Sequence, residues 1–180
     1  MQSQDAPAVW KHLVEGNGRF VDGRMTHFDP KVERRNSARN PTPRAIVLTC
    51  ADPRVVPEYI FDLPPGTLFT IRNAGAGVDT SVVAACDFGL ELFRTPLIVV
   101  MAHTRCAALL AAESSDRFPA LSETTQGERS GAGAAEANVR FGIERLLTSL
   151  GIAAAVRERG VLIQGAIYDV DTGHVKTLPI

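Results

Sequence analysis

The stretch Ala45–Cys50 reads Ala-Ile-Val-Leu-Thr-Cys and contains no charged residue. A continuous apolar run of this kind, rich in β-branched side chains, is typical of a strand that is buried on both faces of a sheet. Leu68–Ile71 and Leu97–Met101 have the same character, and a fourth run covers Val161–Tyr168. The chain is therefore expected to be built around a mainly parallel sheet.

Segments with apolar residues at helical spacing lie between and before these strands. The spacing predicts helices over Ala6–Val21, Thr80–Phe93 and Cys106–Glu113, and another that carries the apolar residues of Val139–Leu150. Cys86 falls on the apolar face of the second helix and is interpreted as a core packing residue. Strands that alternate with helices predict an α/β fold with helices on both faces of the sheet.

The remaining segments are polar and are interpreted as connections. Residues 28–43 are rich in Arg, Asn and Pro, residues 114–133 are rich in Ser, Thr and Gly, and neither is expected to hold a regular element. A turn at Asp171–Gly173 leads into a short antiparallel edge strand near Val175–Leu178. With no internal repeat, the prediction is one domain over residues 1–180, in which an N-terminal helix and arm (1–43) precede the α/β core (44–180).

Composition excludes several classes of function. The 180 residues include 19 basic and 20 acidic side chains, and this balance gives no reason to expect nucleic acid or an anionic membrane as a partner. No run approaches the roughly 18 apolar residues of a membrane span, and the first residues do not resemble a secretory signal. P-loop and Gly-x-Ser-x-Gly motifs are absent. Three cysteines in such a chain favour reduced thiols and a cytoplasmic location.

Three residues that can bind a metal follow the ends of two predicted strands. Cys50 ends the first strand, and His103 comes just past the third. Ligands of open α/β sheets bind outside the carboxyl ends of strands, so these side chains can meet. His103 and Cys106 are three apart where a helix is expected to begin, which places them on one side of its first turn. Two thiolates and an imidazole predict a zinc site with one position left for water, whereas the alternative is two buried thiols and a core histidine.

An acid and a base stand beside the first cysteine. Asp52 and Arg54 are two apart on a segment expected to be extended, so their side chains point to the same side and can pair. The Arg54 guanidinium would keep Asp52 ionised. The Asp52 carboxylate can then accept a hydrogen bond from water on the zinc, or bind the zinc itself as a fourth ligand. A purely structural ion pair is the alternative.

The spacing of these residues matches a known family. The sequence resembles the β-class carbonic anhydrases, whose signature is Cys-x-Asp-x-Arg followed some fifty residues later by His-x-x-Cys. Both parts are present, at Cys50–Arg54 and His103–Cys106. The resemblance extends over further stretches of the chain: Glu15–Phe20, Val55–Phe61, Pro65–Gly75, Pro96–Val100 and Gly165–Asp169.

The resemblance implies a zinc enzyme that interconverts carbon dioxide and bicarbonate. It makes Cys50, His103 and Cys106 the zinc ligands, and Asp52 and Arg54 the pair that orients a zinc-bound hydroxide. The apolar pocket for CO2 in this family is built across a dimer interface, which implies a homodimer or a higher homo-oligomer. The positions that line this pocket are Phe69, Ala74 and Phe88.

Several positions depart from the family pattern while the metal ligands are retained. The family commonly has Gln, Ser, Tyr, Gly and Gly where this chain has, in order, Pro41, Pro53, Phe88, Ala102 and Ala107. These changes remove polar contacts around the site. They leave open two alternatives to CO2 hydration: a zinc hydrolase of a related small molecule such as carbon disulfide or carbonyl sulfide, and a catalytically weak homologue that binds zinc or bicarbonate.

Overall fold

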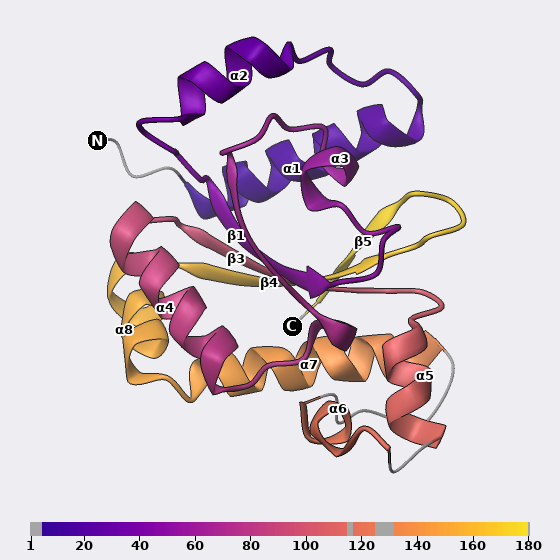
Figure 1. Cartoon of the computed structure of the whole chain (residues 1–180). Coiled ribbons are helices and arrows are strands. Elements are labelled where there is room, and N and C mark those ends of the chain that lie inside the picture. Colours follow the sequence, from indigo (N-terminus) through magenta and orange to yellow (C-terminus); the bar gives the residue numbers. More distant parts are fainter. Residues whose placement is uncertain (1–4, 115–116, 125–131, 180) are drawn as a thin grey trace.

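The computed structural model describes residues 5–114, 117–124 and 132–179. Its centre is a five-stranded sheet in the order β2-β1-β3-β4-β5 (Figure 1). The first four of these strands run parallel, and β5 runs antiparallel to β4. The strands are β1 (Ala45–Cys50), β2 (Leu68–Asn73), β3 (Leu97–His103), β4 (Leu162–Tyr168) and β5 (Val175–Leu178). The predicted α/β fold with an antiparallel C-terminal edge strand is confirmed.

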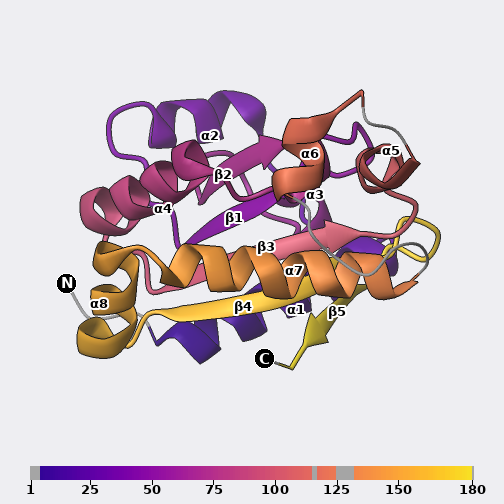
Figure 2. The ribbon, with the colours of Figure 1, turned by 90° about the horizontal axis from the view of Figure 1, so that it is seen from below.

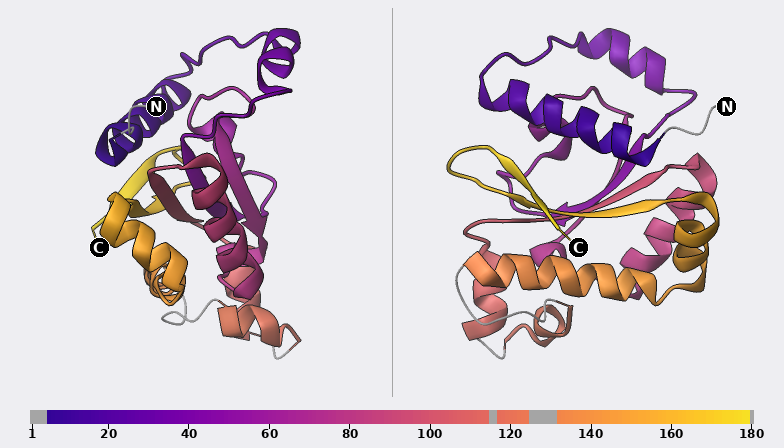
Figure 3. Two further views of the ribbon diagram at one scale, coloured as in Figure 1. Left: turned by 90° about the vertical axis from the view of Figure 1, so that its left-hand side faces the viewer. Right: turned by 180° about the vertical axis from the view of Figure 1, so that it is seen from behind.

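Helices cover both faces of the sheet, as predicted. Helix α1 lies on one face, and α4, α7 and α8 lie on the other (Figures 1 and 3). Seen from below, α7 runs along β3 and β4 (Figure 2). The helices are α1 (Ala6–Val21), α2 (Pro30–Ser37), α3 (Pro57–Ile60), α4 (Thr80–Phe93), α5 (Ala107–Ser114), α6 (Pro119–Thr124), α7 (Ala132–Leu147) and α8 (Leu150–Arg159), and a short 3-10 turn, η1, covers Ala74–Ala76.

Strand β1 is buried at every position because it contributes to two cores at once. Ile46 and Leu48 pack with α4, α7 and α8, whereas Ala45 and Val47 pack with α1 on the other face. Successive side chains of a strand point to opposite faces, so a central parallel strand needs apolar residues at both. The unbroken apolar run in the sequence is the direct result of this position.

The register of the sheet brings the carboxyl ends of its central strands to one edge. Cys50 lies opposite Asn73 of β2, and His103 lies opposite Tyr168 of β4. Strands β1 and β3 are direct neighbours, and therefore Cys50 and His103 end adjacent strands although they are far apart in the sequence. The fold thus positions the predicted ligands before any side-chain contact is considered.

The prediction that residues 28–43 hold no regular element is wrong. Helix α2 occupies part of this segment, and the Asp29 carboxylate caps it by accepting hydrogen bonds from the N–H groups of Lys31 and Val32. None of its residues is buried. It was missed because it carries no apolar stripe, although Asp29 followed by Pro30 is a typical helix start.

The second predicted loop and the helix after it also differ from the structure. The segment 114–133 contains α6 and the first residues of α7, while residues 115–116 and 125–131 lie outside the described part. The predicted helix up to Leu150 is two helices, because α7 ends at Leu147 and the Ser149 hydroxyl caps α8. Leu150 begins α8 and is 88% exposed, not on a buried face. Within the described residues, no helix combines the length and the apolar character that a membrane crossing requires.

Candidate metal site

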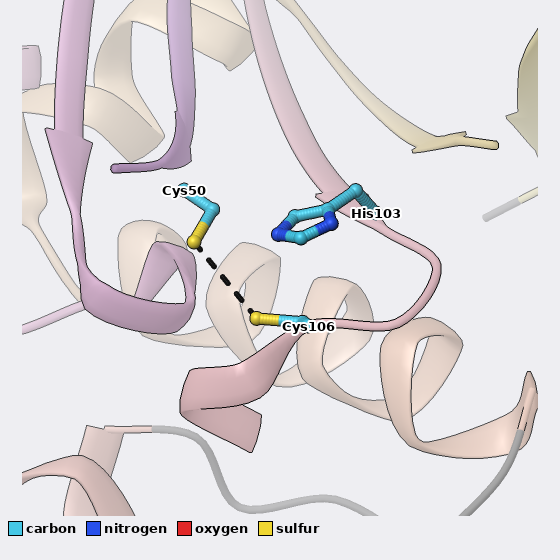
Figure 4. Close-up of side chains that lie close together, drawn as sticks. All are labelled: Cys50, His103 and Cys106. Atoms are coloured by element: carbon cyan, nitrogen blue, oxygen red, sulfur yellow. Dashed lines mark hydrogen bonds between the residues drawn. The ribbon is translucent and has the colours of Figure 1, made fainter. Parts of the chain in front are cut away.

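Three buried side chains from three different segments meet at the carboxyl edge of the sheet. Cys50 ends β1, His103 ends β3, and Cys106 precedes α5 (Figure 4). The potential ligand atoms of these residues lie within 4.8 Å of one another, and the two sulfur atoms are 3.8 Å apart. The sequence predicted this set, and the structure brings all three members together.

A tight turn, not a helical turn, joins His103 to Cys106. His103 still belongs to β3, and α5 begins only at Ala107, so the predicted placement on a first helical turn is wrong. Arg105 adopts the left-handed conformation with φ of 57°, which a residue with a Cβ rarely does. The Thr104 N–H donates to the Tyr168 carbonyl at 2.9 Å, and the Thr104 hydroxyl accepts from the Val170 N–H at 3.0 Å. The turn is therefore held against the end of β4.

The thiols of Cys50 and Cys106 have pKa values shifted in opposite directions. A hydrogen bond from Cys106 is the largest cause of a lowered pKa at Cys50, and the N–H groups of Asp52 and Gly75 contribute in the same direction. The same contact and burial raise the pKa of Cys106. Cys86 differs from both, because burial in the core raises the pKa of its thiol to about 12. Of the three cysteines, Cys50 is thus the one most readily held as a thiolate, the form that binds metals.

His103 presents an unpaired nitrogen to the two sulfur atoms. Its Nδ1 lies 2.8 Å from the Thr104 carbonyl, to which it donates when that nitrogen carries the proton. Its Nε2 is buried and has no hydrogen-bond partner among the described residues. Burial lowers the pKa of His103, but its contacts with the Cys50 sulfur and the Thr104 carbonyl outweigh burial and raise it. A metal-bound histidine typically donates its other N–H to a carbonyl or carboxylate, as this geometry allows.

Asp52 and Arg54 form the ion pair that the sequence predicted. Arg54 Nε and Nη2 donate to the two carboxylate oxygens of Asp52 at 2.9 and 2.8 Å. The segment is a turn and not extended, because the Val55 N–H donates to the Asp52 carbonyl, and Pro53 fits this turn without breaking the pair. The bonds from Arg54 hold the pKa of Asp52 well below its usual range. Asp52 Oδ2 lies 3.9 Å from His103 Nε2, so an ionised carboxylate borders the three potential ligands.

Arg72 is a further residue at the site that the sequence reasoning did not assign. From β2, its Nε donates to the Cys50 carbonyl at 3.0 Å and its Nη2 donates to the Asp52 carbonyl at 2.8 Å. It thereby holds the backbone on either side of Ala51 and fixes the segment that carries Cys50 and Asp52. No spacing pattern identifies such a role, because the bonds are made to backbone carbonyls.

The residues expected to line a substrate pocket are not gathered around this metal site. Phe69 and Phe88 contact each other, with ring centroids 6.3 Å apart, and Phe88 is 56% exposed. Phe69 stands opposite Ile46, four positions before Cys50, which corresponds to about 13 Å along a strand. Ala74, in contrast, begins η1 directly after β2. Of the positions that depart from the family pattern, Pro41, Pro53 and Ala107 are exposed and Ala102 is buried.

The sequence is similar to carbonic anhydrases. A family model described as carbonic anhydrase matches residues 45–125. Carbonic anhydrase 2 of Mycobacterium tuberculosis is 40% identical over 113 residues, which cover 62% of this chain and 55% of the relative. The carbonic anhydrase of Mycolicibacterium smegmatis is 38% identical over 118 residues, which cover 64% and 56%. The chain thus spans just over half the length of these curated relatives.

The structure is similar to solved β-carbonic anhydrases over nearly its whole length. The β-carbonic anhydrase CafA of Aspergillus fumigatus superposes with a TM-score of 0.72 at 26% identity, covering 96% of this chain and 89% of the other. The β-carbonic anhydrase CcaA, at 22% identity, shares the fold with a TM-score of 0.74 over 94% and 95%. The chain is thus similar to carbonic anhydrases in sequence over more than half of its length, and its fold is that of solved β-carbonic anhydrases.

Proposed function

We propose that the protein catalyses the reversible hydration of carbon dioxide to bicarbonate at a zinc ion held by Cys50, His103 and Cys106. The observation that carries this proposal is the buried Nε2 of His103, which has no hydrogen-bond partner among the described residues and faces two sulfur atoms. An unpaired buried nitrogen costs about 1–3 kcal/mol unless a ligand occupies its lone pair. Two sulfurs and one imidazole are a donor set that fits zinc with a fourth position open.

The metal supplies one part of the chemistry. Bound zinc lowers the pKa of water to about 7 and so provides a nucleophile at neutral pH. Asp52, kept ionised by Arg54, is placed to accept a hydrogen bond from the reacting water and to orient it. Arg72 donates to the backbone carbonyls of Cys50 and Asp52 and so holds these two residues in a fixed position relative to each other. Alternatively, Asp52 occupies the fourth position itself and closes the site.

We further propose a homodimer or higher homo-oligomer in which the Phe69–Phe88 pair lines the CO2 pocket of a second copy. The support is that this apolar pair is part of the surface and lies far along the strands from the metal site of its own chain. Strand β2 is an edge of the sheet in the described chain, so a neighbouring copy can approach it. The cytoplasm remains the proposed compartment, because all three cysteines are free thiols.

Stopped-flow CO2 hydration between pH 6.5 and 9, on protein of known zinc content, tests the function. We expect activity that rises with pH in the unaltered protein, is lost in Cys106→Ala and is retained in Cys86→Ala, whose thiol packs in the core. Zinc at one ion per chain with no hydration above buffer would contradict the proposal. Release of sulfide from carbonyl sulfide or carbon disulfide by the same protein would then identify a hydrolase, and its absence would leave a binding role.

A further inference from the structure

The three-residue turn η1 lies against the end of β1 that carries Cys50. The Ala51 N–H donates to the Asn73 carbonyl at 2.7 Å, which joins the start of η1 to the residue after Cys50. Gly75, in the middle of the turn, has φ of 73°, and η1 packs against β1 and β3, the strands that end at Cys50 and His103. The position of η1 beside these two strand ends depends on how the turn is held.

Two amide side chains hold the turn through its carbonyl groups. Asn73 Nδ2 donates to the Gly77 carbonyl at 2.8 Å, a contact within the same loop. Asn138 Nδ2 donates to the Gly75 carbonyl at 2.8 Å from a different element, helix α7. Asn138 therefore ties the centre of η1 to helix α7.

Helix α7 is a rigid support for this contact. Gly142 lies one helical turn after Asn138, and a Cβ at this position would meet Val78 at 3.1 Å and Val100 at 3.3 Å. The helix is thus packed closely against the segment that leaves η1 and against β3. A side chain that projects from this face has little freedom to move relative to the metal site.

The chemistry of Asn138 argues against a role in packing alone. Its side chain is only 2% exposed, and its Oδ1 has no hydrogen-bond partner among the described residues. A buried and unpaired acceptor is unfavourable, and leucine, with nearly the same shape, would avoid it. What leucine cannot supply is the N–H that Gly75 requires.

We infer that Asn138 is a positioning residue: by holding the Gly75 carbonyl it fixes η1 against the end of β1 and so keeps the Cys50 sulfur oriented toward the metal. This inference rests on the proposed zinc site. Groups that hydrogen-bond or orient metal ligands typically change metal affinity or activity 10–100-fold when they are removed. The effect of Asn138 is thus expected in the affinity for zinc, with no contact between Asn138 and the metal.

Asn17 offers a matched control. It is 3% exposed, and its Nδ2 donates to the carbonyls of Ile60 and Gly173 while its Oδ1 accepts from the Val175 N–H. It is therefore a buried asparagine that joins loops, as Asn138 is, but it lies on the α1 side of the sheet, and none of its hydrogen-bond partners belongs to η1 or to the three potential metal ligands. Replacing it tests what a structural asparagine does to metal binding.

The experiment measures the zinc Kd of the full-length chain by competition with a chelator of known affinity. We expect Asn138→Leu to raise the Kd by about 10–100-fold and Asn17→Leu to lower the melting temperature while leaving the Kd unchanged. A folded Asn138→Leu with the Kd of the unaltered protein, or equal effects of both variants, would overturn the inference. Failure of the unaltered protein to bind zinc would instead overturn the proposed function, and the inference with it.

A second variant separates hydrogen bonding from folding. In Asn138→Asp the side chain keeps its shape and can donate to the Gly75 carbonyl only while protonated. The ratio of its zinc Kd to that of the unaltered protein should therefore increase as the pH rises. A ratio that does not depend on pH, or failure of both Asn138 variants to fold while Asn17→Leu folds, would show that Asn138 acts on the fold alone and would overturn the inference.

Discussion

Buried polar groups occur both at the end of the sheet where Cys50, His103 and Cys106 meet, here called the metal edge, and on the side covered by α1. The two regions differ in how these groups are hydrogen-bonded. On the α1 side, Asp62 is 1% exposed and accepts from Arg19 Nε and from the N–H and hydroxyl of Thr26. Both carboxylate oxygens of Asp62 thus accept hydrogen bonds from the chain. At the metal edge, His103 Nε2 has none among the described residues.

This difference separates a structural polar cluster from a ligand site. Buried polar groups that the chain pairs by itself stabilise the fold, whereas groups left unpaired are unfavourable until something else binds them. Changes at the metal edge should therefore alter activity and metal content with little loss of stability. Changes around Asp62 should do the reverse.

The largest expected effect follows from loss of a sulfur ligand. Cys50→Ala removes the residue that holds the thiolate and should abolish both CO2 hydration and stoichiometric zinc, because two protein ligands bind zinc poorly. The fold should persist, as measured by circular dichroism. Retention of one zinc per chain in this variant would contradict the proposed site, since the metal would then lie elsewhere.

A smaller effect is expected from the ion pair. Asp52→Asn and Arg54→Gln should each lower the rate of CO2 hydration by about 10–100-fold while zinc remains bound, if this pair orients the reacting water as proposed and does not hold the metal. Stopped-flow kinetics measures the rate, and zinc analysis checks that the metal remains bound. Loss of zinc in Asp52→Asn would instead indicate that Asp52 is a metal ligand.

On the α1 side, Gly16→Ala should destabilise the protein. A Cβ at Gly16 would lie 1.9 Å from the Phe61 carbonyl oxygen, so α1 must move away from the segment after α3, at a cost of about 1–3 kcal/mol or more. Gly18 is the matched control, because nothing lies within 4 Å of its Cβ position. Gly18→Ala should stabilise the helix by about 0.5–1 kcal/mol. Urea unfolding of both variants measures the two changes, and equal changes would contradict the close approach.

The Asp62 cluster should show its contribution in the pH dependence of stability. Burial raises the pKa of Asp62, but the bonds from Arg19 and Thr26 outweigh burial and lower it. A carboxyl whose pKa is lower in the folded state stabilises the fold above its unfolded pKa of about 3.9, and this stability is lost as the pH falls through the folded pKa. Asp62→Asn should therefore cost about 1–3 kcal/mol at pH 7 and progressively less below pH 4. A difference in unfolding free energy that does not change with pH would contradict this.

How far the sequence predicted these regions depends on the kind of signal each one leaves. Strands β1 and β3 were predicted because burial on both faces requires continuous apolar runs, and Cys50 and His103 followed from their ends. Helix α2 was missed because nothing in it is buried, and the start of α8 because apolar residues continue across the Ser149 cap.

The supporting residues of the site could not be predicted in this way. Arg72 and Asn138 act by donating to backbone carbonyls, and such bonds depend on three-dimensional register and not on a spacing in the sequence. The left-handed Arg105 likewise follows from the tight turn between β3 and α5. Side-chain identity predicted the potential metal ligands, whereas the contacts that orient them required the structure.

Zinc X-ray absorption spectroscopy on the purified protein, with its zinc content quantified, tests the proposed metal site most directly. We expect one zinc per chain with two sulfur ligands at about 2.3 Å and one nitrogen at about 2.0–2.1 Å, and an oxygen completing the site. Such a shell would identify the unpaired Nε2 of His103 and the two thiols as one metal site. A zinc shell without sulfur, or protein that binds no zinc at all, would contradict it.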